Sequence, residues 1–187
     1  MLKEIINQTT DAVVAAVEGT DDILSAVTTA VTHQATSVLK DSGEVSNTGV
    51  DAVASVASGA VKAAGQVGES VSKVAVSTMS GIVKGVSQVG GDVIKAVRSG
   101  AHGIIQTAGE AGEDVGKVAV AVVEQSIKSA GDVGADTAAA AEAAVGGALD
   151  AAAKVGGDAG DKVREALLSA ASLPRDVIES AIKGKNS

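Results

Sequence analysis

The sequence predicts an all-α protein: very long helices with 11- and 22-residue repeats, packed as a coiled-coil-like bundle, a helical barrel or a filament. Three observations carry this prediction. A motif of Val-Gly and an acidic residue returns every 22 residues, an apolar stripe repeats every 11 residues, and the 187 residues include no Phe, Tyr, Trp or Cys. Aromatic rings supply much of the buried area of compact domains. Without them, the chain must bury many small side chains along the length of extended helices.

The 22-residue motif occurs five times in succession. Its copies are Val67-Gly68-Glu69, Val89-Gly90-Gly91-Asp92, Ala111-Gly112-Glu113-Asp114, Val133-Gly134-Ala135-Asp136 and Val155-Gly156-Gly157-Asp158. A fixed period of this length is typical of repeat proteins. Half the period is also visible, because every eleventh position from Val53 to Val163 is Ala or Val. Eleven residues make three helical turns, so the stripe stays on one face of a continuous helix.

Residues 1–48 are predicted to form an acidic N-terminal helical segment, with two lysines and seven acids. The apolar stripe extends backward through this segment, for example at Val31, Val13 and Ile5. Asp21-Asp22 fits the first turn or the N-cap of a helix, where acids are favourable. The apolar run at the N-terminus is too short for the apolar region of a signal peptide, and no transmembrane helix is expected. The location is therefore unknown, and cytoplasmic by default.

Residues 49–160 are predicted to form a Gly-, Ala- and Val-rich repeat helix. They hold 20 of the 23 glycines. At roughly 0.8–1 kcal/mol for each glycine relative to alanine, a continuous helix would lose more stability than a typical domain has, so a partner surface must hold it. A competing interpretation treats each Val-Gly-x-acid as a turn between short helices. The unbroken phase of the stripe favours the continuous helix, because loops of arbitrary length would scramble it.

Residues 161–187 are predicted to form a C-terminal helical end with a break near Pro174. Ser172 is a candidate N-cap for a short last helix that stops near Gly184. A second weak point is the polar stretch over residues 41–49.

The predicted interface between helices uses the glycines of the motif as notches that let a neighbouring backbone approach. These are Gly68, Gly90, Gly112, Gly134 and Gly156, which alternate along one row with Ala57, Met79, Ala101, Val123 and Val145. A neighbouring apolar row adds Val71, Ile82, Val93, Ile104 and Val115. The pairs Gly81/Gly85 and Gly112/Gly116 also fit a GxxxG close-packing pattern, which is common by chance in a glycine-rich chain.

The sequence offers little for catalysis, and we expect no catalytic, cofactor-binding or metal site. His33 and His102 are isolated, and no nucleophile, base and orienting group can be assembled from spacing. Nucleic acid is not an expected partner, because the formal net charge is −8 and the chain has neither a basic block nor an aromatic side chain to stack a base.

The 11-residue pattern over roughly residues 50–160 resembles hendecad-repeat proteins in general, and more weakly the repeats of perilipins, synucleins and exchangeable apolipoproteins. That resemblance implies a helix that folds on a lipid surface. The interfacial lysines of those families are missing here, because lysines such as Lys84 and Lys95 lie in the middle of the polar face.

The leading functional hypothesis is therefore a non-enzymatic structural protein that self-assembles through small-residue helix faces into a bundle, tube or filament, with copies of itself as partners. The alternative is a peripheral coat on a membrane, lipid droplet or storage granule.

Overall fold

The computed structural model describes residues 1–41 and 47–185, and over these residues it contains nine helices and no strand. The all-α prediction is confirmed. The helices are α1 (Leu2–Val17), α2 (Ile23–Asp41), α3 (Asn47–Val67), α4 (Val71–Gln88), α5 (Val93–Glu110), α6 (Val115–Asp132), α7 (Thr137–Val155), α8 (Ala159–Ser169) and α9 (Arg175–Lys185).

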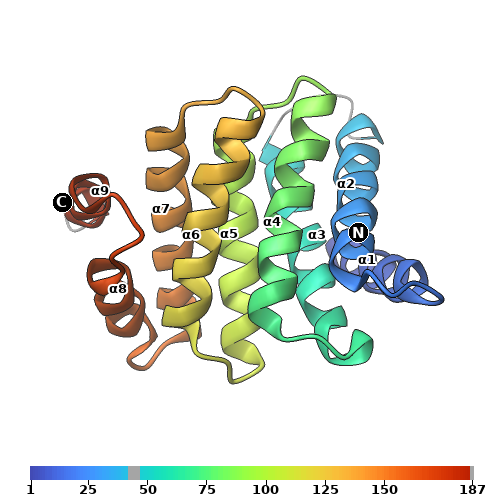
Figure 1. The fold of residues 1–187 in the computed structure, drawn as a ribbon, viewed down its shortest axis with the longest axis horizontal. Coiled ribbons are helices and arrows are strands. Elements are labelled where there is room, and N and C mark those ends of the chain that lie inside the picture. The colour runs from blue at the N-terminus through green and yellow to red at the C-terminus, as the bar shows by residue number, and fades with distance from the viewer. Residues whose placement is uncertain (42–46, 186–187) are drawn as a thin grey trace.

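The helices form a stack of two layers (Figure 1). From α3 to α7, successive helices run up and down. Helices α3, α4 and α5 each contact the helix two places along the chain more extensively than the next helix, whereas α6 contacts α7 as extensively as α4. The even-numbered helices α2, α4, α6 and α8 thus make one layer, and the odd-numbered helices make the other. The structural repeat is a pair of helices, or 44 residues, and the 22-residue period of the sequence is one helix with its turn.

The prediction of very long hendecad helices is not confirmed, because the Val-Gly-acid motif forms turns. Gly68, Gly90, Gly112 and Gly134 all have φ between 69° and 78°, in the left-handed region that glycine adopts without a steric penalty. The residue after each glycine donates its backbone N–H to the carbonyl five residues earlier, for example Gly91 to Val86 at 2.9 Å. This is the hydrogen bond that ends a helix in a Schellman motif.

The acidic residue of the motif starts the next helix. The carboxylates of Asp92, Asp114 and Asp136 each accept a hydrogen bond from a backbone N–H in the first turn of α5, α6 and α7, at 3.0–3.1 Å. These are N-caps, which satisfy donors that the helix itself cannot pair. The first copy of the motif differs, because Ser70 rather than Glu69 caps α4. The last copy also differs, because the Asp158 side chain makes no capping bond.

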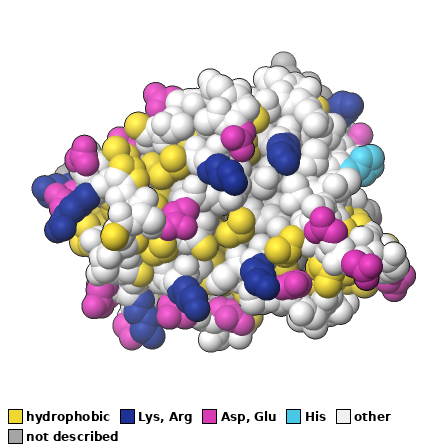
Figure 2. Space-filling view, in the orientation of Figure 1, with side chains coloured by type: hydrophobic (Ala, Val, Ile, Leu, Met, Phe, Trp, Pro, Cys, Tyr) yellow, Lys and Arg dark blue, Asp and Glu magenta, His cyan; other side chains and the backbone are white. Residues whose placement is uncertain are grey.

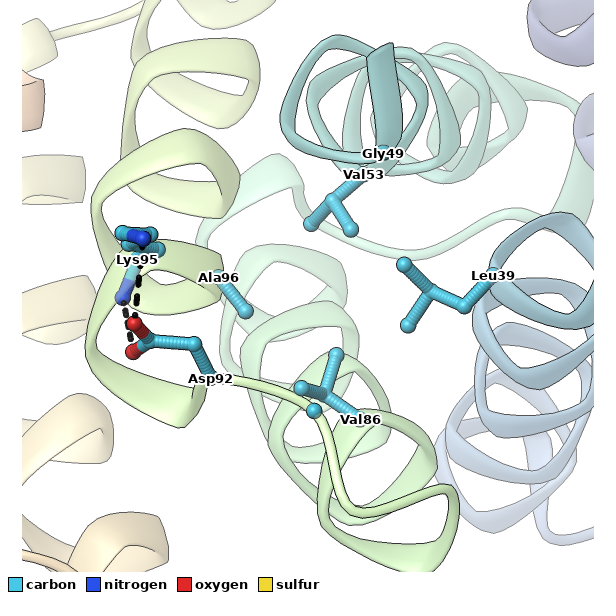
Figure 3. Close-up of a pocket in the computed structure, with 8 residues that line it drawn as sticks. Leu39, Gly49, Val53, Val86, Asp92, Lys95 and Ala96 are labelled. Carbon is cyan, nitrogen blue, oxygen red and sulfur yellow. Dashed lines mark hydrogen bonds and ion pairs between the residues drawn. The ribbon is translucent and has the colours of Figure 1, made fainter. Parts of the chain in front are cut away.

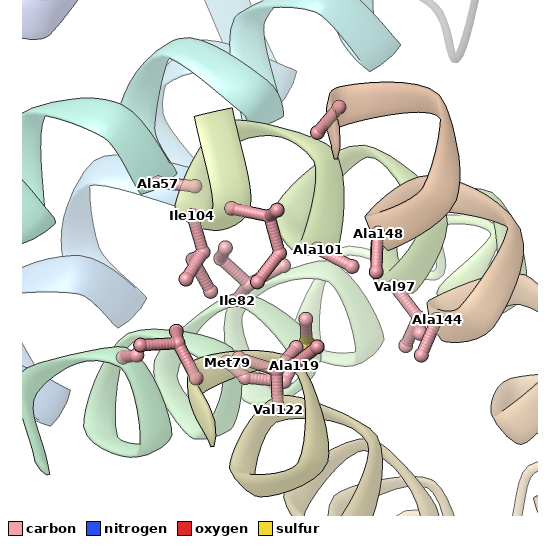
Figure 4. Close-up of a cluster of buried hydrophobic side chains, with 14 of the residues drawn as sticks. Ala57, Met79, Ile82, Val97, Ala101, Ile104, Ala119, Val122, Ala144 and Ala148 are labelled. Atoms are coloured by element: carbon pink, nitrogen blue, oxygen red, sulfur yellow. The ribbon is translucent and has the colours of Figure 1, made fainter. Parts of the chain in front are cut away.

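The core lies between the two layers and consists of small and branched side chains. Met79, Ile82 and Ile104 are fully buried at its centre, with alanines and valines from α3, α5, α6 and α7 around them (Figure 4). One continuous cluster of buried side chains reaches from Ile5 to Ile182. Each inner helix packs against neighbours in its own layer and in the other layer. This stacking buries the apolar surface that aromatic side chains would bury in other compact domains.

The ends of the chain depart from the regular stack. Asp22 caps α2 by accepting from the N–H of Ser25 at 3.1 Å, in agreement with the expectation for Asp21-Asp22. The expected cap by Ser172 is wrong, because its hydroxyl instead bonds the Glu124 carboxylate and α9 begins at Arg175. Of the predicted weak point at 41–49, residues 42–46 lie outside the described residues.

Candidate functional site

The five glycines predicted as notches do not lie between helices. A Cβ added at Gly68, Gly90, Gly112, Gly134 or Gly156 would meet no atom within 4 Å. Their role is conformational, since each takes a positive φ in a turn. The larger residues of the same row are all fully buried: Ala57, Met79, Ala101, Val123 and Val145.

The predicted apolar row packs inside the chain. Ile82, Ile104 and Val115 are buried, and Val71 and Val93 are partly buried against the same core. These five side chains therefore contact other helices of this chain and present little surface to a second copy.

A different glycine row makes the close contacts between helices. Its members are Gly59, Gly81, Gly103 and Gly147, at steps of 22 or 44 residues. A Cβ at Gly81 would lie 2.7 Å from the carbonyl oxygen of Thr28, and a Cβ at Gly147 or Gly103 would overlap the carbonyl of Arg98 or Ala54. Each glycine thus seats its helix against the backbone of the helix two places earlier. Of the two GxxxG pairs, Gly81 and Gly85 both make such contacts, since a Cβ at Gly85 would lie 2.7 Å from the carbonyl oxygen of Thr32. The pair Gly112/Gly116 does not, because Gly112 lies in a turn with no atom within 4 Å of an added Cβ.

Hydroxyl groups bridge the same contacts. Thr10 donates to the carbonyl oxygen of Gly59 at 2.9 Å, and Ser58 donates to that of Gly103 at 3.3 Å. Thr28 and Thr36 make longer bonds of the same kind to α4. Small residues therefore allow close approach, and hydroxyls fix the register of one helix on the next.

The row is interrupted once, on α6, where Gln125 takes the place of glycine. Its amide donates to the Ser129 hydroxyl at 2.8 Å, and α4 and α6 contact each other less extensively than α3 and α5 or α5 and α7. Sequence reasoning missed this row, although a 22-residue step from Gly59 finds it. Two glycine rows share one period, and only the backbone conformation tells which row is in turns.

A cluster of charged side chains lies on the outer face of α5, α7 and α9. Asp150 accepts from Arg98 at 2.5 Å and also pairs with Lys185. Burial alone would raise the pKa of Asp150, but the hydrogen bond from Lys185 and the charge of Arg98 together lower it. A groove of about 720 Å³ runs beside these residues, and Glu142 also lines it. The ion pairs of Asp150 with Arg98 and with Lys185 therefore join three helices.

His102 lies at the end of this cluster, with its Nε2 3.2 Å from Nζ of Lys154. Partial burial and the Lys154 charge lower its pKa below the ordinary value of 6.5. The folded state therefore binds fewer protons than the unfolded state near and below pH 6.5, so folding stability falls as pH drops through that window. We expect His102→Gln to reduce this loss, measured as the shift of the urea midpoint between pH 7.5 and 5.5. An equal shift in both proteins would contradict the assignment.

Open grooves also lie between α6 and α8 and between α2 and α4, whereas the apolar cavity between α2, α3, α4 and α5 is small. The apolar side chains of Leu39, Val53, Val86 and Ala96 surround a cavity of about 10 Å³, beside the Asp92–Lys95 ion pair (Figure 3). That volume holds one water at most. No group of three His, Cys, Asp or Glu side chains with metal-binding geometry occurs in the described part of the chain. On the face shown in Figure 2, basic and acidic side chains are intermixed, and several acidic side chains lie together at the lower right.

Comparisons with known proteins support the fold alone. No protein-family model matches the sequence, and no curated protein matches it. The crystal structure of the de novo designed helical repeat protein DHR7 is similar, with a TM-score of 0.55 and 18% sequence identity; the match covers 100% of this chain and 97% of that chain. No helix among the described residues is long and apolar enough to cross a membrane.

Proposed function

We propose that this protein is a non-enzymatic structural scaffold in which one chain forms the whole stack of helices and presents its outer faces to protein partners. One observation carries the proposal: the Gly, Ala and Val rows are buried between helices of the same chain. The partner surface that the glycine-rich helices require is thus supplied internally. Repeat proteins of this kind offer rigid, extended surfaces for binding.

The small-residue faces of the helices are not available to a second copy of the chain. Copies that associated through the small-residue faces would first have to separate α5 from α7 or α2 from α4, whose backbones are in contact at Gly147 and Gly81. Association of intact stacks would have to use surfaces that are exposed in the single chain. A coat on a lipid surface faces the same difficulty, because its apolar face would have to come from the buried core.

Two measurements on the purified chain test the scaffold proposal. Light scattering after size exclusion is expected to give the mass of one chain, 18.0 kDa, across a wide concentration range. Circular dichroism is expected to show full helicity without lipid and no increase with anionic vesicles. A mass that grows with concentration would support the self-assembling filament, and helicity that appears only with vesicles would support the lipid coat.

A further inference from the structure

A polar groove of about 400 Å³ lies between the outer faces of α2 and α4. The two helices run close together because Gly81 and Gly85 seat α4 on the backbone of α2. The groove is lined by four threonines, one histidine, one lysine and one glutamine: Thr28, Thr29, Thr32, His33, Thr36, Lys84 and Gln88.

The charge of this groove differs from that of the other grooves. None of the described acidic residues lines it, whereas Glu142 lines the groove beside α9, and Asp114 and Glu165 line the groove between α6 and α8. Lys84 is exposed and forms no ion pair within the described part of the chain. Lys40, one turn beyond Thr36 on the same face of α2, is also exposed and unpaired there. Lys84 and Lys40 thus give this groove a local positive charge, although the chain as a whole has a net charge of −8.

The threonines add a regular row of hydrogen-bond acceptors. Thr28, Thr32 and Thr36 donate their hydroxyl protons to backbone carbonyls, which leaves lone pairs of their oxygens for a ligand. Four residues of a helix rise about 6 Å. In an extended peptide, N–H groups on the same edge repeat every two residues, at about 6.6 Å. The threonine oxygens thus match the N–H groups of an extended chain.

From these features we propose that the α2–α4 groove binds an acidic polypeptide segment in extended conformation. The threonine row accepts hydrogen bonds from its backbone, and Lys84, with Lys40 at the end of the groove, binds its carboxylates. A nucleic acid fits less well, because the chain has no aromatic side chain to stack its bases. The inference rests on the proposed scaffold role and names a partner for it.

The test uses a fluorescein-labelled peptide of eight alternating Glu and Ser residues, with the full-length protein and fluorescence anisotropy at low salt. We expect saturable binding that the matching Gln/Ser peptide does not show. Lys84→Gln is expected to weaken binding about fivefold. The matched control, Lys128→Gln, removes an exposed lysine of α6 that lines none of these grooves, and should leave binding unchanged. Thr32→Val should also weaken binding, because it removes an acceptor without a change of charge.

Three outcomes would overturn the inference. The first is that the Glu/Ser peptide does not bind. The second is that Lys84→Gln and Lys128→Gln weaken binding equally. The third is that the protein binds inorganic polyphosphate in a Lys84-dependent way but does not bind the peptide. All three leave the chain mass and the helicity without lipid untouched, so failure of this inference is distinct from failure of the scaffold proposal.

Discussion

Gly147→Val is expected to destabilise the protein by about 3 kcal/mol, because the new side chain would collide with the backbone of α5 at Arg98. Neither partner can move away easily, since the obstacle is a main-chain carbonyl in the middle of a packed helix. The layer α3–α5–α7 would have to separate at this point. Urea denaturation followed by circular dichroism measures the effect as a lower midpoint.

The matched control for this change is Gly65→Ala. Gly65 lies within α3, is exposed, and has no atom within 4 Å of an added Cβ. Alanine there should stabilise the helix by about 0.5–1 kcal/mol, because only the helix propensity changes. If Gly147→Val left the midpoint near that of the wild type, the close contact between α5 and α7 would not contribute to stability.

Gly112→Ala is expected to destabilise the protein by about 1–2 kcal/mol, although the site is exposed and open. The reason is its φ of +78°, which an L-amino acid adopts only with strain. The direction of the effect is diagnostic. In a continuous helix the same substitution would stabilise by about 1 kcal/mol. A raised urea midpoint for Gly112→Ala would therefore support the long helix and contradict the turn.

The sequence predicted the class and the repeat correctly but not the helix length, and α4, α5 and α6 show why. They begin at Val71, Val93 and Val115, each is 18 residues long, and each is followed by a turn of four residues. Because every turn has the same length, and 22 is twice 11, the apolar stripe keeps its phase across the turns. Preserved phase therefore indicated identical turns and not the absence of turns.

The loss of helix stability expected from the glycines is smaller than a continuous helix would suffer. Six glycines of the repeat region have positive φ and lie between helices, so they carry no helix penalty: Gly68, Gly90, Gly112, Gly134, Gly156 and Gly157. Others, such as Gly81 and Gly103, are needed for contact between backbones. The surface against which these glycines pack belongs to the same chain, on the helix two places earlier.

The surface features depend on tertiary structure that periodicity cannot supply. The sequence places Lys84 in a row of solvated lysines and His33 alone. Only the stacking of α4 on α2 brings them into one groove with the threonines. Likewise, Arg98, Asp150 and Lys185 are far apart in sequence and meet because α5, α7 and α9 occupy one layer.

Small-angle X-ray scattering of the purified chain tests most directly whether one chain folds into its own stack of short helices. A compact chain of 187 residues has a radius of gyration of about 16 Å, and the longest helix here, with 21 residues, spans about 30 Å. We expect a value near the compact one. A rod of roughly 250 Å, which a continuous helix would form, has a radius of gyration of about 70 Å and would contradict the stacked fold.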